Sequence, residues 1–416
     1  MKIKTKYRLI KSGFKLSPSK LYREIAERVP ISAINSLPIV WRKAKDFSVW
    51  DDQGNKFIDL TSGIFVANAG HANPLIKQAI KKQLDADLLF AYNYPTEIKN
   101  KFIKKLLSVS PKHFNRVILV NSGSEANQIA YKFIKLYGTK TQKRYIITFK
   151  GGYFGRGLSL DFMSKNPENA SWSRLADPDV IFLDFPYDPS TKFDGKNIPV
   201  PASEIAAFML ETFQGSGAYF YPKGFVRDLC AFAKKHGALV CFDELQSGFY
   251  RLGQLYGYAT YDKGIKPDIV TLGKGMAPLP LGAVLTSDRV FNVQEKLDLY
   301  GTQSGNAVCL AAALANLEFL SDKKNLARIR KIIKIFEREI GKLSSAATLE
   351  KVNVRGMMAG LIFKNKEDAA KVAVYAVEHG VLPVKTSRNF IKIAPPLTIS
   401  EAALKEALEV IKEALR

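Results

Sequence analysis

Lys274 stands between two glycines in the segment 270-VTLGKG-275, at the end of a run of apolar residues. A lysine in that position has no evident role at the surface, and the glycines leave room for a bulky group on its amine. Because burial readily lowers the pKa of lysine, such an amine becomes a nucleophile toward carbonyl compounds. The segment therefore indicates Schiff-base chemistry, with a strand-edge lysine whose amine reaches solvent as the alternative.

Asp243 ends a second apolar run, 238-ALVCFDE-244. A carboxylate at the end of a buried strand is costly unless it meets a cation or a hydrogen-bond donor. A protonated pyridine nitrogen would satisfy Asp243, and so would a salt bridge between domains. This segment alone leaves both interpretations open.

Two small polar segments could bind phosphate. In 121-NSGSEAN-127 the amides of Gly123 and Ser124 would lie at a helix N-terminus, where a phosphate binds well, and the Ser124 hydroxyl adds a donor. The alternative is an ordinary turn and helix cap with Glu125 in the first turn. In 301-GTQSGN-306, Thr302 could supply a further phosphate donor, although that loop is weak evidence by itself.

These segments follow elements that suit an α/β fold. Short apolar runs are typical of strands buried on both faces of a mainly parallel sheet, and they occur at 116–121, 145–150, 180–185, 206–212, 238–244 and 268–274. Amphipathic patterns predict helices at 124–137, where Gly138 offers a stop, and at 225–236. Ligands of such sheets bind beyond the carboxyl ends of the strands, where the polar segments fall.

The pattern changes at both ends of the chain. Residues 47–60 predict a hairpin, two long helical stretches flank 352–363, and residues 400–415 predict a helix. We therefore expect a large α/β domain at 61–310 and a smaller α+β domain built from an N-terminal segment (1–60) and a C-terminal part (311–416).

Composition limits the classes of function. The 416 residues carry a net charge of +23, but the lysines are spread along the chain and no nucleic-acid-binding motif occurs. No apolar run reaches the length of about 18 residues that a membrane helix needs. The N-terminus lacks a signal-peptide core, and three widely spaced cysteines fit a reducing cytoplasm. We expect no nucleic acid, membrane or metal partner.

Seven segments, taken together and in order, resemble the class-III aminotransferases, which are pyridoxal 5'-phosphate (PLP) enzymes of fold type I. They are VNSGSEAN (120–127), GGYFGRG (151–157), ETFQGSGA (211–218), FDELQSGFYRLG (242–253), PDIVTLGKGMAPLPLGA (267–283), TQSGN (302–306) and APPLTISE (394–401). The resemblance covers about residues 47–401, and seven motifs in family order make it specific.

The resemblance implies a role for each matching residue. Lys274 would carry PLP as a Schiff base and move the substrate proton, and Asp243 would keep the pyridine nitrogen protonated. Gln246 resembles the glutamine that bonds the ring 3'-oxygen. Tyr153 occupies the place of the aromatic residue that stacks on the ring, followed by Phe154.

Further cofactor residues are implied in the same way. Ser122, Gly123 and Ser124 match the phosphate cradle, and Glu211 lies in a segment that supports the active site. Thr302 matches a threonine that reaches the phosphate from a neighbouring subunit. The resemblance therefore implies an obligate homodimer with shared sites.

Departures from the family pattern concern the substrate. Phe154 replaces a common histidine, while Arg156 resembles an arginine that binds a substrate carboxylate. Lys392 stands where the family usually has a carboxylate-binding arginine, and Ser216 replaces the glutamate that pairs with that arginine. Lysine cannot form the bidentate contact of arginine, so we expect an altered oxo-acid site. The alternative is that Lys392 points to solvent and that Lys385 or Arg388, just upstream, binds the carboxylate. Phe65 would form an apolar wall at the substrate entrance.

The resulting hypothesis is a PLP-dependent aminotransferase. An amine or amino acid would donate its amino group to the cofactor, and an oxo acid such as pyruvate or 2-oxoglutarate would accept it in a ping-pong cycle. A racemase or epimerase, an aminomutase or a decarboxylase on the same fold is the alternative.

Overall fold

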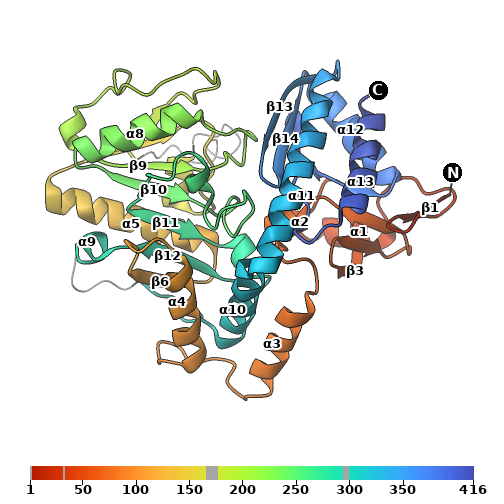
Figure 1. The fold of residues 1–416 in the computed structure, drawn as a ribbon, viewed down its shortest axis with the longest axis horizontal. Coiled ribbons are helices and arrows are strands. Elements are labelled where there is room, and N and C mark those ends of the chain that lie inside the picture. Colours follow the sequence, from red (N-terminus) through yellow and green to blue (C-terminus); the bar gives the residue numbers. More distant parts are fainter. Residues whose placement is uncertain (1, 31–32, 165–176, 294–298) are drawn as a thin grey trace. The chain divides into compact units, whose positions relative to one another are not determined.

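The computed structural model describes residues 2–30, 33–164, 177–293 and 299–416. They form two compact units, shown with both chain ends in Figure 1. The larger unit is Leu75–Ser321, and the smaller unit combines Met1–Pro74 with Asp322–Arg416. A smaller domain built from both chain ends is thus confirmed. The domain limits expected after residues 60 and 310 remain a prediction. The two compact units themselves divide after Pro74 and after Ser321.

A seven-stranded sheet forms the centre of the larger unit. Its strands are β6 (Arg116–Val120), β7 (Tyr145–Phe149), β8 (Val180–Leu183), β9 (Ile205–Glu211), β10 (Leu239–Asp243), β11 (Ile269–Leu272) and β12 (Gly282–Thr286). The spatial order is β6-β12-β11-β10-β9-β7-β8. All pairs from β11 to β8 are parallel, and β12 runs antiparallel to both of its neighbours. The predicted mainly parallel sheet is confirmed. Strand β12 was not predicted, because its apolar run is short and follows residues after Lys274 that are typical of helices and turns.

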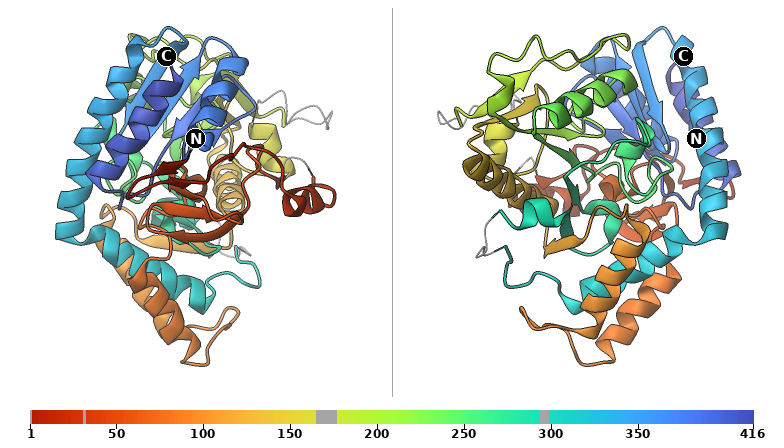
Figure 2. Two further views of the ribbon diagram at one scale, coloured as in Figure 1. Left: turned by 90° about the vertical axis from the view of Figure 1, so that its right-hand side faces the viewer. Right: turned by 60° about the vertical axis from the view of Figure 1, so that its left-hand side comes forward.

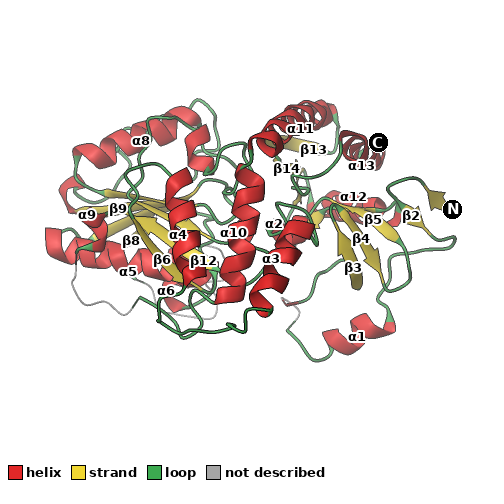
Figure 3. Cartoon of the chain, turned by 60° about the horizontal axis from the view of Figure 1, so that its bottom comes forward, coloured by secondary structure: helices red, strands yellow, loops and turns green. Residues whose placement is uncertain are grey.

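Helices cover both faces of this sheet, with α5 on one face and α8 on the other (Figure 3). The α-helices described between residues 74 and 321 are α3 (Pro74–Leu84), α4 (Glu97–Val109), α5 (Gly123–Thr141), α6 (Leu158–Met163), α8 (Lys223–Lys235), α9 (Asp288–Phe291) and α10 (Ala307–Ser321). Double coverage explains why β9 and β10 are buried along their whole length. None of the described helices is long and apolar enough to cross a membrane.

Helix α5 corrects one prediction. The expected stop at Gly138 is wrong, because the helix continues to Thr141 and ends at Gln142 in a left-handed conformation. Gly138 is buried inside the helix, and a Cβ atom there would collide with the carbonyl oxygen of Lys143. This glycine therefore serves close packing rather than termination.

The smaller unit contains two sheets. One holds β1 (Ile3–Lys4), β2 (Leu9–Ile10), β3 (Trp41–Lys45), β4 (Ser48–Asp51), β5 (Lys56–Asp59) and β15 (Val381–Leu382); the other holds β13 (Leu349–Arg355), β14 (Met358–Phe363), β16 (Val384–Lys385) and β17 (Phe390–Ile393). The predicted hairpin at 47–60 is confirmed as β4–β5. Strand β15 pairs in parallel with β5, so N-terminal and C-terminal segments share one sheet.

Helices complete the smaller unit. They are α1 (Lys20–Ala26), α2 (Ser62–Phe65), α11 (Lys323–Gly341), α12 (Lys366–Glu378) and α13 (Glu401–Ala414). Helices α11 and α13 lie side by side (Figure 2). The predicted C-terminal helix at 400–415 is confirmed as α13, and Ser400 caps it by accepting a hydrogen bond from the amide of Ala403.

Glu244 is a fully buried carboxylate that joins three segments of the larger unit. It accepts hydrogen bonds from the hydroxyls of Thr212 (2.6 Å) and Ser247 (2.8 Å). The amides of Gly257 and Tyr258 donate two more, each at 2.6 Å. Burial raises its pKa to about 7, although these donors favour the charged form. Glu244 therefore anchors the loop after β10.

Replacing Glu244 with alanine should lower the free energy of unfolding by about 3–5 kcal/mol, because it leaves buried donors without an acceptor. Chemical denaturation of this variant and of Glu318→Ala, at an exposed position on α10, would measure the difference. Equal stability of the two variants would contradict an anchoring role for Glu244.

Candidate active site

A cavity of about 170 Å³ opens in the larger unit beyond the carboxyl ends of β9, β10 and β11. All predicted cofactor residues except Thr302 line it, and they do so together with Gly155, Phe213 and Leu245. The lining side chains are those of Ser122, Ser124, Tyr153, Phe154, Glu211, Asp243, Gln246 and Lys274, with the backbone of Gly123. The parallel strands thus bring together residues that are up to about 150 positions apart in the sequence, as their carboxyl ends meet at one edge.

Lys274 and Asp243 form the charged centre of this cavity. Asp243 is the last residue of β10, and Lys274 follows β11 with a left-handed φ of 44°. Burial lowers the pKa of the Lys274 ammonium, while the carboxylates of Asp243 and Glu211 oppose that shift. Burial likewise raises the pKa of Asp243, and Lys274 counteracts it. The pair therefore combines an amine biased toward its neutral form with a buried acceptor.

Glu211 lies beside Asp243, since the two residues are register partners on β9 and β10. Its carboxylate accepts hydrogen bonds from the amides of Tyr153 (2.9 Å) and Gly215 (2.9 Å). Burial and the charge of Asp243 raise its pKa to about 8. Glu211 thus fixes the backbone position of Tyr153.

The N-terminus of α5 contributes an anion site to the cavity lining. Ser122 caps the helix by accepting a bond from the Glu125 amide at 3.2 Å. Gly123 and Ser124 line the cavity in the first turn of this 19-residue helix. Gly155, with φ of 125°, crosses directly over Ser124, where any Cβ atom would strike the serine hydroxyl. A phosphate fits this arrangement of amides and hydroxyl.

Gln246 and Tyr153 also line the cavity. The Oε1 atom of Gln246 is buried and has no hydrogen-bond partner in the described part of the chain. A buried oxygen of this kind is costly unless a donor from a ligand meets it. The phosphate cradle, the orphaned amide oxygen and the buried Asp243 together fit a phosphorylated pyridine ring such as PLP.

The substrate residues predicted in the larger unit lie outside this lining. Arg156 is exposed, and its guanidinium carbon lies 5.3 Å from the centre of the Tyr153 ring. Ser216 donates a hydrogen bond to the carbonyl oxygen of Gly151. Arg156 therefore belongs to the 151–157 segment that carries Tyr153, and Ser216 contacts that segment.

The substrate residues predicted in the smaller unit contact each other. Lys392, on β17, is 7% exposed, and Phe65 is 1% exposed. The Lys392 Nζ atom lies 5.1 Å from the centre of the Phe65 ring, at cation–π distance. The sequence did not indicate this contact, which joins residues far apart along the chain.

Thr302 is exposed in the loop before α10 and does not line the cavity of its own chain. Asn127, in contrast, was not singled out from the sequence, although its amide donates to Asp243 Oδ2 at 2.7 Å. The available signal was a polar residue on the apolar face that includes Ala126 and Ala130. Among the described residues, no group of three or more His, Cys, Asp and Glu side chains could hold a metal ion.

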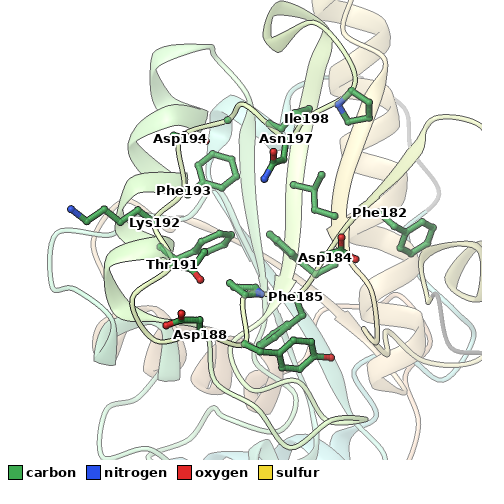
Figure 4. A pocket seen from close by; sticks show the side chains of 17 residues that line it. Phe182, Asp184, Phe185, Asp188, Thr191, Lys192, Phe193, Asp194, Asn197 and Ile198 are labelled. Carbon is green, nitrogen blue, oxygen red and sulfur yellow. The ribbon is translucent and has the colours of Figure 1, made fainter.

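A larger cavity, of about 630 Å³, lies beside the edge strand β8 (Figure 4). Aromatic side chains such as Phe185 and Phe193 line it together with Asp184 and Asn197. None of the predicted site residues belongs to this lining. Its greater volume does not make this cavity the candidate site, since the buried titratable groups Glu211, Asp243 and Lys274 line the smaller one.

Comparisons with known proteins agree with this geometry. The chain matches the class-III aminotransferase family over residues 31–415. It is 30% identical over 397 residues to the acetylornithine aminotransferase of Methanopyrus kandleri, covering 95% of this chain and 98% of that protein. It is 29% identical over 415 residues to the leucine/methionine racemase of Thermococcus litoralis, covering 92% of each chain.

A solved structure shows the same fold. The ornithine aminotransferase of Toxoplasma gondii, in which PLP partially occupies the active site, is 22% identical and has a TM-score of 0.84 over 96% of this chain and 94% of that one. The chain belongs to the class-III aminotransferases. It is thus an enzyme of the transaminase class with the fold type I of PLP-dependent transferases.

Proposed function

We propose that this enzyme moves an amino group from an amine or amino acid to an oxo acid, with PLP as its cofactor, in two half-reactions. The observation that carries the proposal is the cavity in which Lys274 and Asp243 lie near the α5 N-terminus. When bound, PLP supplies an electron sink that stabilises negative charge at the substrate Cα. Three free cysteines favour a cytoplasmic location.

Each lining residue has a role in this proposal. Lys274 would hold the cofactor covalently, and its amine, biased toward the neutral form, would carry the proton that leaves the substrate Cα. Asp243 would accept a hydrogen bond from the ring nitrogen. Gln246 would accept a hydrogen bond from the ring 3'-hydroxyl at its orphaned Oε1, and Tyr153 would cover the ring face. Ser122, Gly123 and Ser124 would bind the phosphate.

The proposed acceptor site uses Lys392 to bind the oxo-acid carboxylate, with Phe65 as its apolar neighbour. The cation–π contact supports this role, because it holds the ammonium in place on a buried strand beside an apolar ring. Arg156 remains a candidate for a second carboxylate, and Ser216 replaces an acidic group that would compete for a cation.

Replacing Lys392 with alanine should raise the KM for pyruvate or 2-oxoglutarate by about 10- to 100-fold, because a charged hydrogen bond to the carboxylate is lost. The first half-reaction with an amine that lacks a carboxylate should keep its rate. Lys385→Ala, at the rival lysine on the neighbouring strand β16, is the comparison variant. An unchanged KM for every oxo acid in Lys392→Ala would contradict this role of Lys392, and a raised KM in Lys385→Ala would assign the carboxylate to Lys385.

A homodimer with shared sites is part of the proposal. Leu89, Phe90 and Tyr94 are large apolar or aromatic side chains exposed between α3 and α4. The amide of Asn306 donates to Leu89 O at 3.0 Å, so this surface adjoins the Thr302 loop. An exposed apolar surface of this kind suits a protein partner, and a second copy would carry Thr302 to the neighbouring phosphate. Sedimentation of a monomer at assay concentrations would contradict this.

Absorbance spectroscopy tests the activity directly. The purified enzyme, loaded with PLP, is mixed with single amines without an acceptor, and pyruvate or 2-oxoglutarate is then added. We expect the yellow cofactor band to bleach with a donor and to return with the oxo acid. A band that never bleaches, together with exchange of the Cα proton of an amino acid, would favour racemisation, the activity named for the Thermococcus litoralis relative.

A further inference from the structure

We infer that Asn127 is a positioning residue that holds the Asp243 carboxylate and the backbone of Phe154, next to Tyr153, in one fixed arrangement. The inference rests on the proposed function, because its purpose is to align the groups that would meet the ring nitrogen and the ring face of PLP. Asn127 itself is not among the residues that line the cavity.

The side-chain amide of Asn127 makes two hydrogen bonds at once. Asn127 is fully buried on α5, and its Nδ2 atom donates to Asp243 Oδ2 at 2.7 Å and to the carbonyl oxygen of Phe154 at 2.7 Å. Both partners are acceptors, so only the NH₂ group can face them. The orientation of the amide is therefore determined by its two partners.

The oxygen atom of this side-chain amide, Oδ1, shows that burying Asn127 costs folding free energy. Asn127 Oδ1 is buried and has no hydrogen-bond partner in the described part of the chain. A buried acceptor without a donor destabilises the folded state, whereas an apolar side chain of similar shape would not. Its helix neighbours Ala126, Ala130 and Phe133 are apolar and fully buried. A residue that merely filled this space would be apolar as well.

The two hydrogen bonds link groups with complementary tasks. Asp243 accepts its other hydrogen bond from the Leu245 amide at 2.8 Å, and it has acceptor capacity left at the cavity. Tyr153 is held on one side by the bond from its amide to Glu211 and on the other by Asn127 through Phe154 O. A displacement of Asn127 would therefore move the carboxylate and the tyrosine ring together.

The charged and titratable groups around Asp243 define the readout. Lys274 and Asn127 favour its carboxylate form, and burial opposes it. Glu211, Tyr153 and Cys241 are further titratable groups that interact with Asp243. Without the Asn127 donor the pKa of Asp243 rises, and the carboxylate is lost at a higher pH. As the pH is lowered, binding of PLP to the variant should therefore begin to weaken at a higher pH than binding to the unmodified protein.

The test compares Asn127→Leu with a matched control, Asn55→Leu. Asn55 is also fully buried and also donates to a buried aspartate, Asp51 Oδ2, at 2.7 Å, but it belongs to the smaller unit. Equilibrium dialysis of each full-length protein against PLP, at several pH values, gives the Kd. We expect at least a 10-fold higher Kd for Asn127→Leu, an acid limb moved to higher pH, and a change below twofold for the control.

The possible outcomes separate the two proposals. Failure of the unmodified protein to bind PLP would overturn both the proposed function and this inference. Equal Kd values and acid limbs in the unmodified protein and Asn127→Leu would overturn this inference alone. If Asn127→Leu does not fold, Asn127→Asp keeps the shape but turns an oxygen toward both acceptors, and the same shift is expected; an unchanged profile there would equally overturn it.

Discussion

Replacing Lys274 with alanine should lower kcat/KM by at least about 10³-fold, because the proposed proton carrier and covalent anchor are lost together. The variant should still bind PLP through the α5 N-terminus and Asp243, but without a covalent bond. Borohydride reduction followed by mass spectrometry would show the bond at Lys274 in the unmodified enzyme and its absence in the variant.

Lys143→Ala is the control for this loss. Burial also lowers the pKa of Lys143, but its ammonium donates to the carbonyl oxygens of Ser203 and His236, away from the cavity. Substantial activity in Lys274→Ala, or attachment of the cofactor to another lysine, would remove Lys274 from the centre of the proposed mechanism.

The second large effect is expected for Asp243→Asn, which should lower kcat by about 10²- to 10³-fold. The amide has nearly the same shape but no charge, so it cannot keep the ring nitrogen protonated and the electron sink is weakened. Rates of the donor half-reaction, followed by absorbance, measure this effect separately from substrate binding.

Asp268→Asn provides the matched comparison. Asp268 precedes β11, burial raises its pKa, and it accepts a hydrogen bond from the Val240 amide at 2.9 Å. It lies outside the cavity lining. Comparable losses of kcat in both variants would mean that Asp243 acts through the fold rather than on the cofactor.

The sequence predicted those parts of the site that follow from strand ends. Asp243 ends β10 and Lys274 follows the neighbouring buried strand β11, and parallel strands bring such residues to one edge of a sheet. The capped start of α5 could also be predicted, because Ser122 and Glu125 lie close together in the sequence and a helix cap is a local structure. These inferences require no knowledge of side-chain packing.

Other features depend on tertiary packing and could not be predicted. The role of Asn127 depends on which face of α5 packs against β10 and on where the fold places the carbonyl group of Phe154. The Lys392–Phe65 contact depends on pairing between distant segments of the smaller unit. Gly138 has the residue type of a helix stop, but the neighbouring chain at Lys143 makes it a packing position instead.

The pairing of β15 with β5 has a consequence for synthesis of the chain. Ile58 meets Val381 in one sheet, so the first segment of the smaller unit cannot complete its sheet until the ribosome has made nearly all of the chain. At about 5–20 residues per second, that delay is on the order of tens of seconds. The larger unit is contiguous from Leu75 to Ser321, and it can be complete while the N-terminal strands still lack their partner. The edge of β5 that β15 will cover is therefore open to aggregation until the end of synthesis.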